Sequence, residues 1–408
     1  MTKPPNGKAA AASRPTIPNS ELRKRPARLG RALADAGFEA WIAYGDDRAV
    51  AGADHIRFLA NLEPHFEPIF VVGRADQSQV VLLTGPETIG YAALVTQGTA
   101  IDEIIAIDEL VHPEEEYPTI SISSGADRLR SLFSGTKRIA VLGMDAIPTT
   151  AGRRLLDPLR EGGWVTSSGD SVAYALRAVK TDAEQAVIDE AYRIARAGLE
   201  AVATSLRPGI TERDVAATAE AAMRHAGAEG FGIDTMVASG VANTAPILAR
   251  STFRTIGPDD TVTVTLAPRY EGYHAALARA FLFRPNLEVQ RAIEVAVRGQ
   301  RAALEYFKVG VEGRRSALAV REVLESGSTG AELPYVPVHS VGLIEFEPPI
   351  FLSSSNTPIQ NGMALSVDAA LFHGPWGGLR IEDGFSIQSG EVKPRFADYE
   401  AIVPTMLA

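Results

Sequence analysis

The chain has 408 residues, of which 46% are apolar and 22% charged, as expected for a globular protein with a sizeable buried core. Its 50 acidic and 40 basic residues give a net charge of −10, which argues against a nucleic-acid backbone as the main partner. The absence of cysteine excludes disulfides and thiolate zinc sites, and no apolar run approaches the ~18 residues that span a membrane. We therefore expect a cytoplasmic protein with neither a nucleic-acid nor a membrane partner.

The N-terminal part of the chain is predicted to form an α/β domain. Residues 1–19 are rich in Pro, Ala and Lys, and we expect them to be a disordered arm. In residues 20–165, a helical pattern over 20–37 is followed by short apolar runs that end in glycine: EAWIAYG, PIFVVG, QVVLLTG and RIAVLG. Such runs are typical of buried strands with helices between some of them.

The second domain, residues 166–408, is predicted to contain an internal duplication. After a linker near 161–180, a capping-box pattern at Thr181 and Glu184 begins a long helix, and a second helix starts at Thr211. A similar pair of helical patterns follows at an offset of 101 residues, measured from Gly209 to Gly310, and strand-like runs follow each pair. Two similar α+β halves that form one curved antiparallel sheet would place a site at their junction.

Four stretches carry the candidate site residues: VTVTLAPRYEGYHAALARAF (262–281), VHSVGLIEFEPP (338–349), GMALSVDAALF (362–372) and GGLRIEDGF (377–385). Together they resemble the creatinase and Xaa-Pro aminopeptidase family, whose fold is called pita-bread. The segment LRAVKTDAEQAVIDEA, between the two predicted domains, is similar to that family as well. The resemblance implies an α+β protein, with a creatinase-like N-terminal α/β domain over 20–165 and a pita-bread catalytic-type domain over 166–408.

The resemblance also implies where metal ligands would lie. Peptidases of the family bind two metal ions with five side chains, and the corresponding positions here are Thr265, Ala276, His339, Asp368 and Glu382. Two auxiliary histidines of the family fall on Ile247 and Phe346. Both aspartate ligands are therefore lost. Because two divalent ions need bridging carboxylates, the resemblance does not predict an active dinuclear metallopeptidase.

Creatinase is the nearest parallel within the family, since it resembles this chain in lacking the two aspartates and works without metal. Its catalytic histidine, however, corresponds to Ile247 here, and a glutamate of its site corresponds to Ala278. We expect a metal-independent hydrolase that acts on a C–N or amide-type bond of a small polar nitrogenous molecule. His339 would be the general acid/base, with Asp368 and Glu382 assisting it.

Further residues are predicted to contact the substrate: Thr265, His274, Arg380, His373 and Phe346. We place His274 near the rim of the cleft, although alternation along a strand cannot show which face is wet. His65 and Phe66 lie in FLANLEPHFEP, at the position of a family loop that reaches the partner's active site in dimers. The resemblance thus implies a homodimer in which the N-terminal domain contributes to the partner's site.

Several alternatives remain open at this stage. We expect no cofactor, but His339, Asp368 and Glu382 could hold a single divalent ion, as in a residual mononuclear metallopeptidase, or form a hydrogen-bonded polar remnant. The same acid–base groups could catalyse a non-hydrolytic reaction, as a lyase, isomerase or cyclase. A pseudoenzyme that binds a small molecule without chemistry is the remaining alternative.

Overall fold

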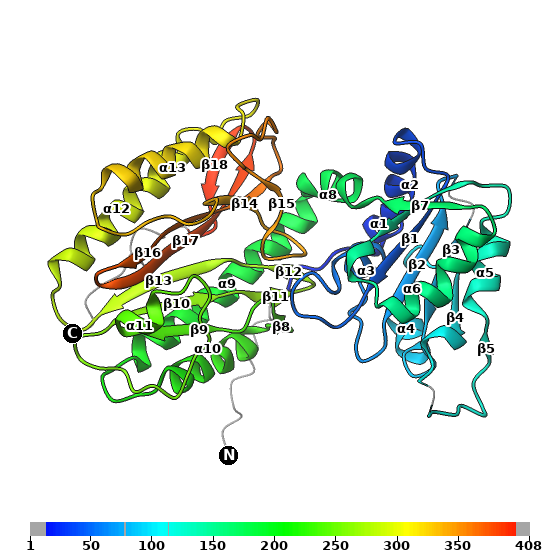
Figure 1. The fold of residues 1–408 in the computed structure, drawn as a ribbon, viewed down its shortest axis with the longest axis horizontal. Helices are drawn as coiled ribbons and strands as arrows, with labels where there is room; N and C mark the ends of the chain where they lie inside the picture. The colour runs from blue at the N-terminus through cyan, green and yellow to red at the C-terminus, as the bar shows by residue number, and fades with distance from the viewer. Residues whose placement is uncertain (1–13, 77–78, 113, 397–408) are drawn as a thin grey trace, which may run out of the picture.

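The structure is a computed structural model that describes residues 14–76, 79–112 and 114–396. It has two lobes joined by helix α8 (Figure 1). In the N-terminal lobe, a seven-stranded mixed sheet has the order β5-β4-β3-β2-β1-β6-β7. Its strands are β1 (Ala40–Gly45), β2 (Ile69–Arg74), β3 (Val80–Thr84), β4 (Glu103–Ile107), β5 (Ile122–Ser123), β6 (Arg138–Leu142) and β7 (Val165–Ser168).

The central strands of this sheet coincide with the four predicted apolar runs. Central strands are covered on both faces, so their sequences are apolar throughout. All residues of β1 and β3 are buried. The surrounding helices are α1 (Asn19–Leu22), α2 (Arg25–Asp35), α3 (Asp54–Ala60), α4 (Ile89–Val95), α5 (Gly125–Leu132), α6 (Thr149–Leu155) and α7 (Asp157–Glu161). The predicted α/β architecture of this part of the chain is therefore confirmed.

Two expectations near the domain ends are corrected. Residues 1–13 of the predicted arm lie outside the described residues, but Ile17 is buried and the carbonyl of Pro15 accepts a hydrogen bond from Tyr270. The predicted linker near 161–180 instead contains β7 and helix α8 (Asp170–Ala178). Both segments have a composition typical of loops, which is why they were expected to be irregular. In the folded protein, apolar contacts and hydrogen bonds hold them in place.

The C-terminal lobe contains an eight-stranded antiparallel sheet with the order β15-β14-β16-β17-β13-β10-β9, in which β18 also pairs with β17. Its strands are β9 (Met236–Ser239), β10 (Thr261–Leu266), β13 (Leu277–Leu282), β14 (Val338–Ser340), β15 (Glu347–Ile350), β16 (Ala364–Gly374), β17 (Gly377–Gln388) and β18 (Glu391–Pro394). A smaller sheet is formed by β8 (Gly230–Phe231), β11 (Pro268–Tyr270) and β12 (Tyr273–His274).

Two pairs of helices pack on the large sheet, one pair for each predicted half. They are α9 (Asp182–Ser205) with α10 (Glu212–Ala226), and α12 (Leu287–Leu304) with α13 (Arg314–Ser326); the short helix α11 (Gly240–Thr244) follows β9. Figure 1 shows the two pairs along opposite margins of the C-terminal lobe, with the strands between them. The helices therefore shield from water the face of the sheet on which they pack.

The predicted duplication is visible in the backbone hydrogen bonds. The N–H of Gly209 donates to the carbonyl of Ile256, and the N–H of Gly310 donates to that of Ile359. Both glycines have positive φ, +92° and +86°, as is needed where the chain turns sharply after a long helix. The capping box of Thr181 and Glu184 is also formed, which confirms the predicted start of α9.

Among the residues that the structure describes, no helix combines the length and the apolar character that crossing a bilayer requires.

Candidate active site

The antiparallel register places the candidate residues in one row across the large sheet. Thr265 of β10 pairs with Ala278 of β13, Ala278 pairs with Glu382 of β17, and Glu382 pairs with Asp368 of β16. On the adjoining strand β14, His339 pairs with Ser366 of β16. Residues paired in this way share a face of the sheet, so segments more than one hundred positions apart meet in a single buried site.

His339 is held between a carbonyl and a carboxylate. Its Nδ1 lies 3.0 Å from the carbonyl oxygen of Ser340, which can only accept, so Nδ1 carries a proton. Its Nε2 lies 3.4 Å from Oε1 of Glu382, and the Phe346 ring packs on the imidazole with centroids 4.3 Å apart. With Nδ1–H fixed, Nε2 can face the carboxylate favourably only if it is protonated or if a cation lies between the two groups.

The electrostatics of this pair are consistent with that geometry. Burial alone would lower the pKa of His339, but the hydrogen bond to Glu382 and the charges of Glu345 and Glu382 raise it above its ordinary value. Burial would likewise raise the pKa of Glu382, but the contact with His339 lowers it. Both shifts favour an ion pair when no metal is present.

Glu345 is a site residue that the sequence analysis missed. One ligand atom from each of His339, Glu345 and Glu382 lies within 4.8 Å of the others, which makes the three a possible metal-binding group. Burial and the neighbouring charge of Glu382 raise the pKa of Glu345 to about 7. The acidic residues of IEFEPP were the available signal, but the family motif has no ligand at this position, so the comparison with the family passed over it.

Asp368 is close to the site but lies outside this group of three. Its Oδ2 accepts a hydrogen bond of 2.7 Å from the Tyr335 hydroxyl and lies 3.6 Å from Nε of Arg380. Its Oδ1 has no hydrogen-bond partner among the described residues. Burial raises the pKa of Asp368 to about 6, partly offset by Arg380. The predicted ligand set of His339, Asp368 and Glu382 is therefore corrected: the structure groups Glu345 with His339 and Glu382.

Thr265 and Arg380, both predicted to contact substrate, line the same small cavity. It measures about 20 Å³ and is also bordered by Met236, Ile247 and Phe372. Arg380 donates a hydrogen bond to the carbonyl of Ile247 and is positioned against the rings of Tyr335 and Phe372. The wall of this cavity combines the hydroxyls of Thr244, Thr263 and Thr265 and one guanidinium with apolar side chains.

His274 and His373 do not lie in this cavity. His274 is buried, and both its backbone N–H and its ring Nδ1 contact the carbonyl of Gly342. The expected position at the rim is therefore wrong, because the β11–β12 turn folds back under the 340–347 loop. His373 is exposed, with φ +58° and an ion pair to Glu332 outside the site.

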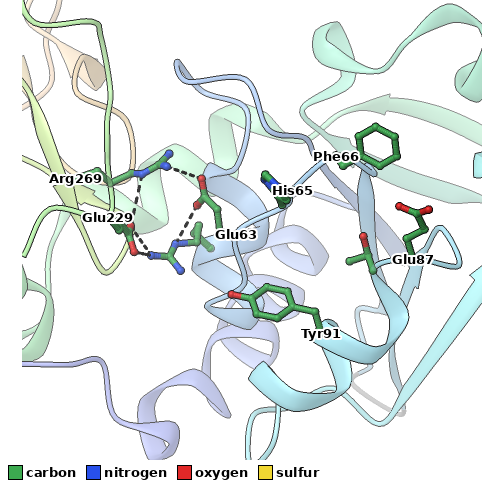
Figure 2. Close-up of a pocket in the computed structure, with 9 residues that line it drawn as sticks. Glu63, His65, Phe66, Glu87, Tyr91, Glu229 and Arg269 are labelled. Carbon is green, nitrogen blue, oxygen red and sulfur yellow. Dashed lines mark hydrogen bonds and ion pairs between the residues drawn. The ribbon is translucent and has the colours of Figure 1, made fainter. Parts of the chain in front are cut away.

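His65 and Phe66 line a separate cavity of about 560 Å³ between the two lobes (Figure 2). One wall holds two ion-paired arginines: Arg269 with Glu63, and Arg57 with Glu229. Phe66, with φ +68° and 68% of its surface exposed, projects away from that wall. This cavity shares none of its lining residues with the one beside Thr265, so His65 and Phe66 do not line that site within one chain. Their contribution to a partner's site stays a prediction.

The residues present fit one divalent ion better than two. Around His339, three carboxyl groups (Glu345, Asp368 and Glu382) face one guanidinium, that of Arg380, which leaves two negative charges when the acids are ionised. Within the part of the chain that the structure describes, Oε2 of Glu382 is buried without a hydrogen-bond partner. A single divalent ion would balance this charge. Two ions would lack the carboxylates that Thr265 and Ala276 do not supply.

Comparisons with known proteins agree with this fold. The sequence model of metallopeptidase family M24 matches residues 186–389. The chain is 27% identical over 288 residues to an Xaa-Pro dipeptidase of Pyrococcus furiosus, which covers 70% of this chain and 80% of that protein. It is 30% identical over 284 residues to a probable dipeptidase, PepE, of Mycobacterium bovis, covering 67% and 73%. The match to a putative dipeptidase, YkvY, of Bacillus subtilis covers only 61% of that protein.

Solved structures show the same architecture. An X-Pro aminopeptidase of Thermotoga maritima superposes with a TM-score of 0.74 over 91% of this chain and 96% of that one, at 21% identity. A prolidase of Pyrococcus horikoshii gives 0.75 over 92% and 98%, at 19% identity. The two-lobed architecture and the row of polar side chains on the curved sheet define a pita-bread hydrolase. The chain belongs to metallopeptidase family M24.

This membership overturns one expectation. The prediction that the protein needs no cofactor is wrong, because the family is one of metallopeptidases and because His339, Glu345 and Glu382 form a possible metal-binding group. The expectation rested on the residues at family ligand positions alone. Glu345, the candidate ligand that the fold adds, lies outside those positions.

Proposed function

We propose that the chain hydrolyses a C–N or amide-type bond of a small polar nitrogenous molecule, at a site where His339, Glu345 and Glu382 hold a single divalent ion. The observation that carries this proposal is the convergence of their ligand atoms within 4.8 Å, in a buried site where three carboxyl groups face the single guanidinium of Arg380. A bound ion would polarise a carbonyl group and lower the pKa of a water molecule.

The chain's own residues would orient the substrate. Arg380 and Thr265 offer a guanidinium and a hydroxyl to the cavity beside the ion-binding group. The unpartnered Oδ1 of Asp368 is available to accept a hydrogen bond from a substrate N–H. Phe346 covers the face of His339 and limits the access of water to the imidazole.

A second candidate for the same residues is proton transfer by His339 itself. It is favoured by the Nδ1–H, which the carbonyl of Ser340 holds in place and which leaves Nε2 as the nitrogen that can exchange a proton, with Glu382 3.4 Å away. In this case Nε2 would exchange a proton with the substrate, and Glu382 would stabilise the imidazolium. The two candidates differ in metal content, so one measurement separates them.

The test combines elemental analysis with titration of the metal-free protein by Mn²⁺. We expect about one divalent ion per chain, and we expect Glu345→Gln to weaken Mn²⁺ binding at least ~10-fold because a ligand charge is lost. Glu63→Gln is the matched control: Glu63 is also a partly buried acid with a raised pKa, but it pairs with Arg269 in the other cavity. Equal Mn²⁺ affinity in the wild type and Glu345→Gln would refute the ion site and leave proton transfer by His339.

Xaa-Pro dipeptides are the first substrates to assay, since a relative that covers most of this chain bears that name. Hydrolysis should be followed in ¹⁸O-labelled water, because incorporation of ¹⁸O separates hydrolysis from elimination or isomerisation. The supporting variant is His339→Ala, which removes the central residue under both candidates. Turnover at the wild-type rate in His339→Ala would refute both.

A further inference from the structure

The loop that carries Glu345 is folded around another carboxylate, that of Glu347. Residues 340–347 connect β14, which bears His339, to β15, and Ser340 pairs with Glu347 where the two strands meet. A Cβ at Gly342 would overlap the Glu347 carboxylate, so the loop backbone passes directly over this group. The Glu347 side chain is only 1% exposed. The position of the Glu347 carboxylate therefore constrains the path of the loop.

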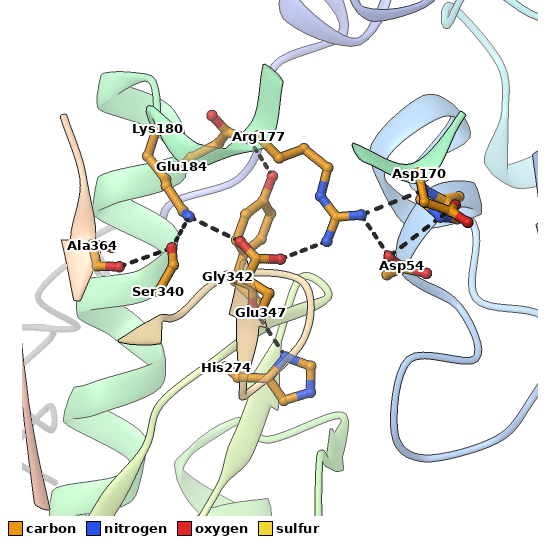
Figure 3. Close-up of polar contacts among 12 residues, drawn as sticks. Asp54, Asp170, Arg177, Lys180, Glu184, His274, Ser340, Gly342, Glu347 and Ala364 are labelled. Carbon is orange, nitrogen blue, oxygen red and sulfur yellow. Dashed lines mark hydrogen bonds and ion pairs between the residues drawn. The ribbon is translucent and has the colours of Figure 1, made fainter. Parts of the chain in front are cut away.

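Glu347 is held by two cations from outside the large sheet (Figure 3). Nη2 of Arg177, on the connecting helix α8, lies 2.5 Å from Oε2, and Nζ of Lys180 lies 2.9 Å from Oε1. Lys180 also donates a 2.8 Å hydrogen bond to the hydroxyl of Ser340, the residue next to His339. Both ends of the loop are thus tied to the segment that joins the two lobes.

The same network continues into the N-terminal lobe. Nη1 of Arg177 lies 2.5 Å from Oδ2 of Asp54, the first residue of α3. The side chains of Asp54 and Arg177 are 3% and 2% exposed. A continuous chain of buried ion pairs therefore runs from α3 through Arg177 and Glu347 to the loop that bears Glu345.

We propose that Asp54, Arg177 and Lys180 are positioning residues for the ion-binding group, and that they couple the placement of the N-terminal lobe to the position of Glu345. The proposal rests on the ion site proposed above. A buried ion pair contributes little net stability, but loss of one partner leaves the other as an uncompensated buried charge that moves toward water. If Arg177 is lost, Glu347 is expected to shift, and the loop over it should shift as well.

A second buried ion pair between the two lobes supplies a control for this role. Arg25 of α2 also joins the two lobes, through Glu184 of α9 and the hydroxyl of Tyr273, and is as buried as Arg177. Its other partners are Glu21 and the carbonyl of Phe58. None of these partners belongs to the 340–347 loop. Arg25→Met is therefore a matched control that removes an equivalent charge from the same junction.

The test uses the full chain, prepared without metal, and compares wild type, Arg177→Met, Arg177→Lys and Arg25→Met. Mn²⁺ affinity is measured by calorimetry, and hydrogen exchange is measured in the metal-free protein over residues 338–350. We expect Arg177→Met to weaken Mn²⁺ binding at least ~10-fold and to accelerate exchange at 340–347. Arg177→Lys should recover part of both effects because it keeps the charge. Arg25→Met should retain wild-type values.

The possible results separate this inference from the ion site itself. A folded Arg177→Met protein with wild-type Mn²⁺ affinity and wild-type exchange at 340–347 would overturn the inference. If the wild type binds no Mn²⁺, the ion site is refuted, and exchange alone decides whether the network positions the loop. If Arg177→Met does not fold, Asp54→Asn serves instead, since it preserves shape, and unchanged exchange in that variant would overturn the coupling.

Discussion

Thr265 and Ala276 occupy the positions where the family resemblance places two metal-binding aspartates, and both are buried, at 2% and 0% exposure. Their side chains leave the site without the charge that a second ion would need. A hydroxyl and a methyl group can instead lie against an uncharged part of a substrate. The loss of the two aspartates therefore changes both the metal capacity of the site and the shape of its pocket.

The double substitution Thr265→Asp with Ala276→Asp is expected to restore a second ion. Without metal, the added buried carboxylates should destabilise the protein by at least ~2 kcal/mol, because no cation accompanies them. With Mn²⁺, the ion content should rise from one to two per chain, and the stability should recover. Elemental analysis and thermal unfolding with and without Mn²⁺ check this. A variant that retains one ion and gains no stability from Mn²⁺ would contradict it.

His274 is expected to make stability depend on pH. Burial lowers its pKa from 6.5 to about 4, so as pH falls below 6.5 the unfolded chain takes up a proton before the folded one does. The stabilisation from burying neutral His274 is therefore fully present above pH 6.5. As the pH falls from 6.5 to 4, the free energy of unfolding decreases progressively, by about 3 kcal/mol. The non-titrating His274→Asn, which can still donate to the Gly342 carbonyl, should lack this loss in urea unfolding between pH 7.5 and 4.5. Identical pH profiles for the two proteins would rule the effect out.

At the scale of elements, close contact between helices and the curved sheet fixes the site strands. Gly384 of β17, two residues after Glu382, lies against the ring of Tyr192 on α9, and a Cβ there would overlap the phenol. Tyr192 is 1% exposed and cannot easily move aside. The sheet can therefore approach α9 this closely only because position 384 has no side chain.

Gly384→Ala is expected to destabilise the protein by about 1–3 kcal/mol, because it overpacks this contact. Gly90→Ala is the control: Gly90 lies in helix α4, and a Cβ there meets no atom within 4 Å, so it should be neutral or slightly stabilising. Urea unfolding of both variants measures the difference. A Gly384→Ala protein as stable as Gly90→Ala would show that α9 and β17 can separate without cost.

At the scale of the whole molecule, the two lobes meet through buried ion pairs, and the cavity of about 560 Å³ shown in Figure 2 lies between them. Phe66 is exposed beside this cavity, as are several other large apolar side chains elsewhere on the surface. A second chain would cover it. The homodimer remains a prediction based on the family resemblance.

We expect light scattering to give a mass of twice 43.5 kDa. Phe66→Asp should shift the protein toward the monomer, because it places a charge on the surface that would be buried. Glu332→Lys, an exposed charge change beside His373, serves as the control and should leave the mass unchanged. A wild-type mass of 43.5 kDa at high concentration would refute the dimer.

The α/β and α+β parts, the duplication and three of the polar residues at the site could all be predicted from the amino-acid sequence. Apolar periodicity, glycine stops and capping boxes are local signals, and they specify α9, α10 and the buried strands directly. His339, Asp368 and Glu382 could be found because they lie within motifs.

Other contacts became known only from the folded structure. Glu345 joins His339 and Glu382, His274 is buried under Gly342, and Asp54 and Arg177 reach Glu347. Those contacts depend on how loops fold over the sheet and on how the two lobes meet. Neither is encoded in the spacing of residues along one segment, because each is set by packing between segments that are distant in the chain.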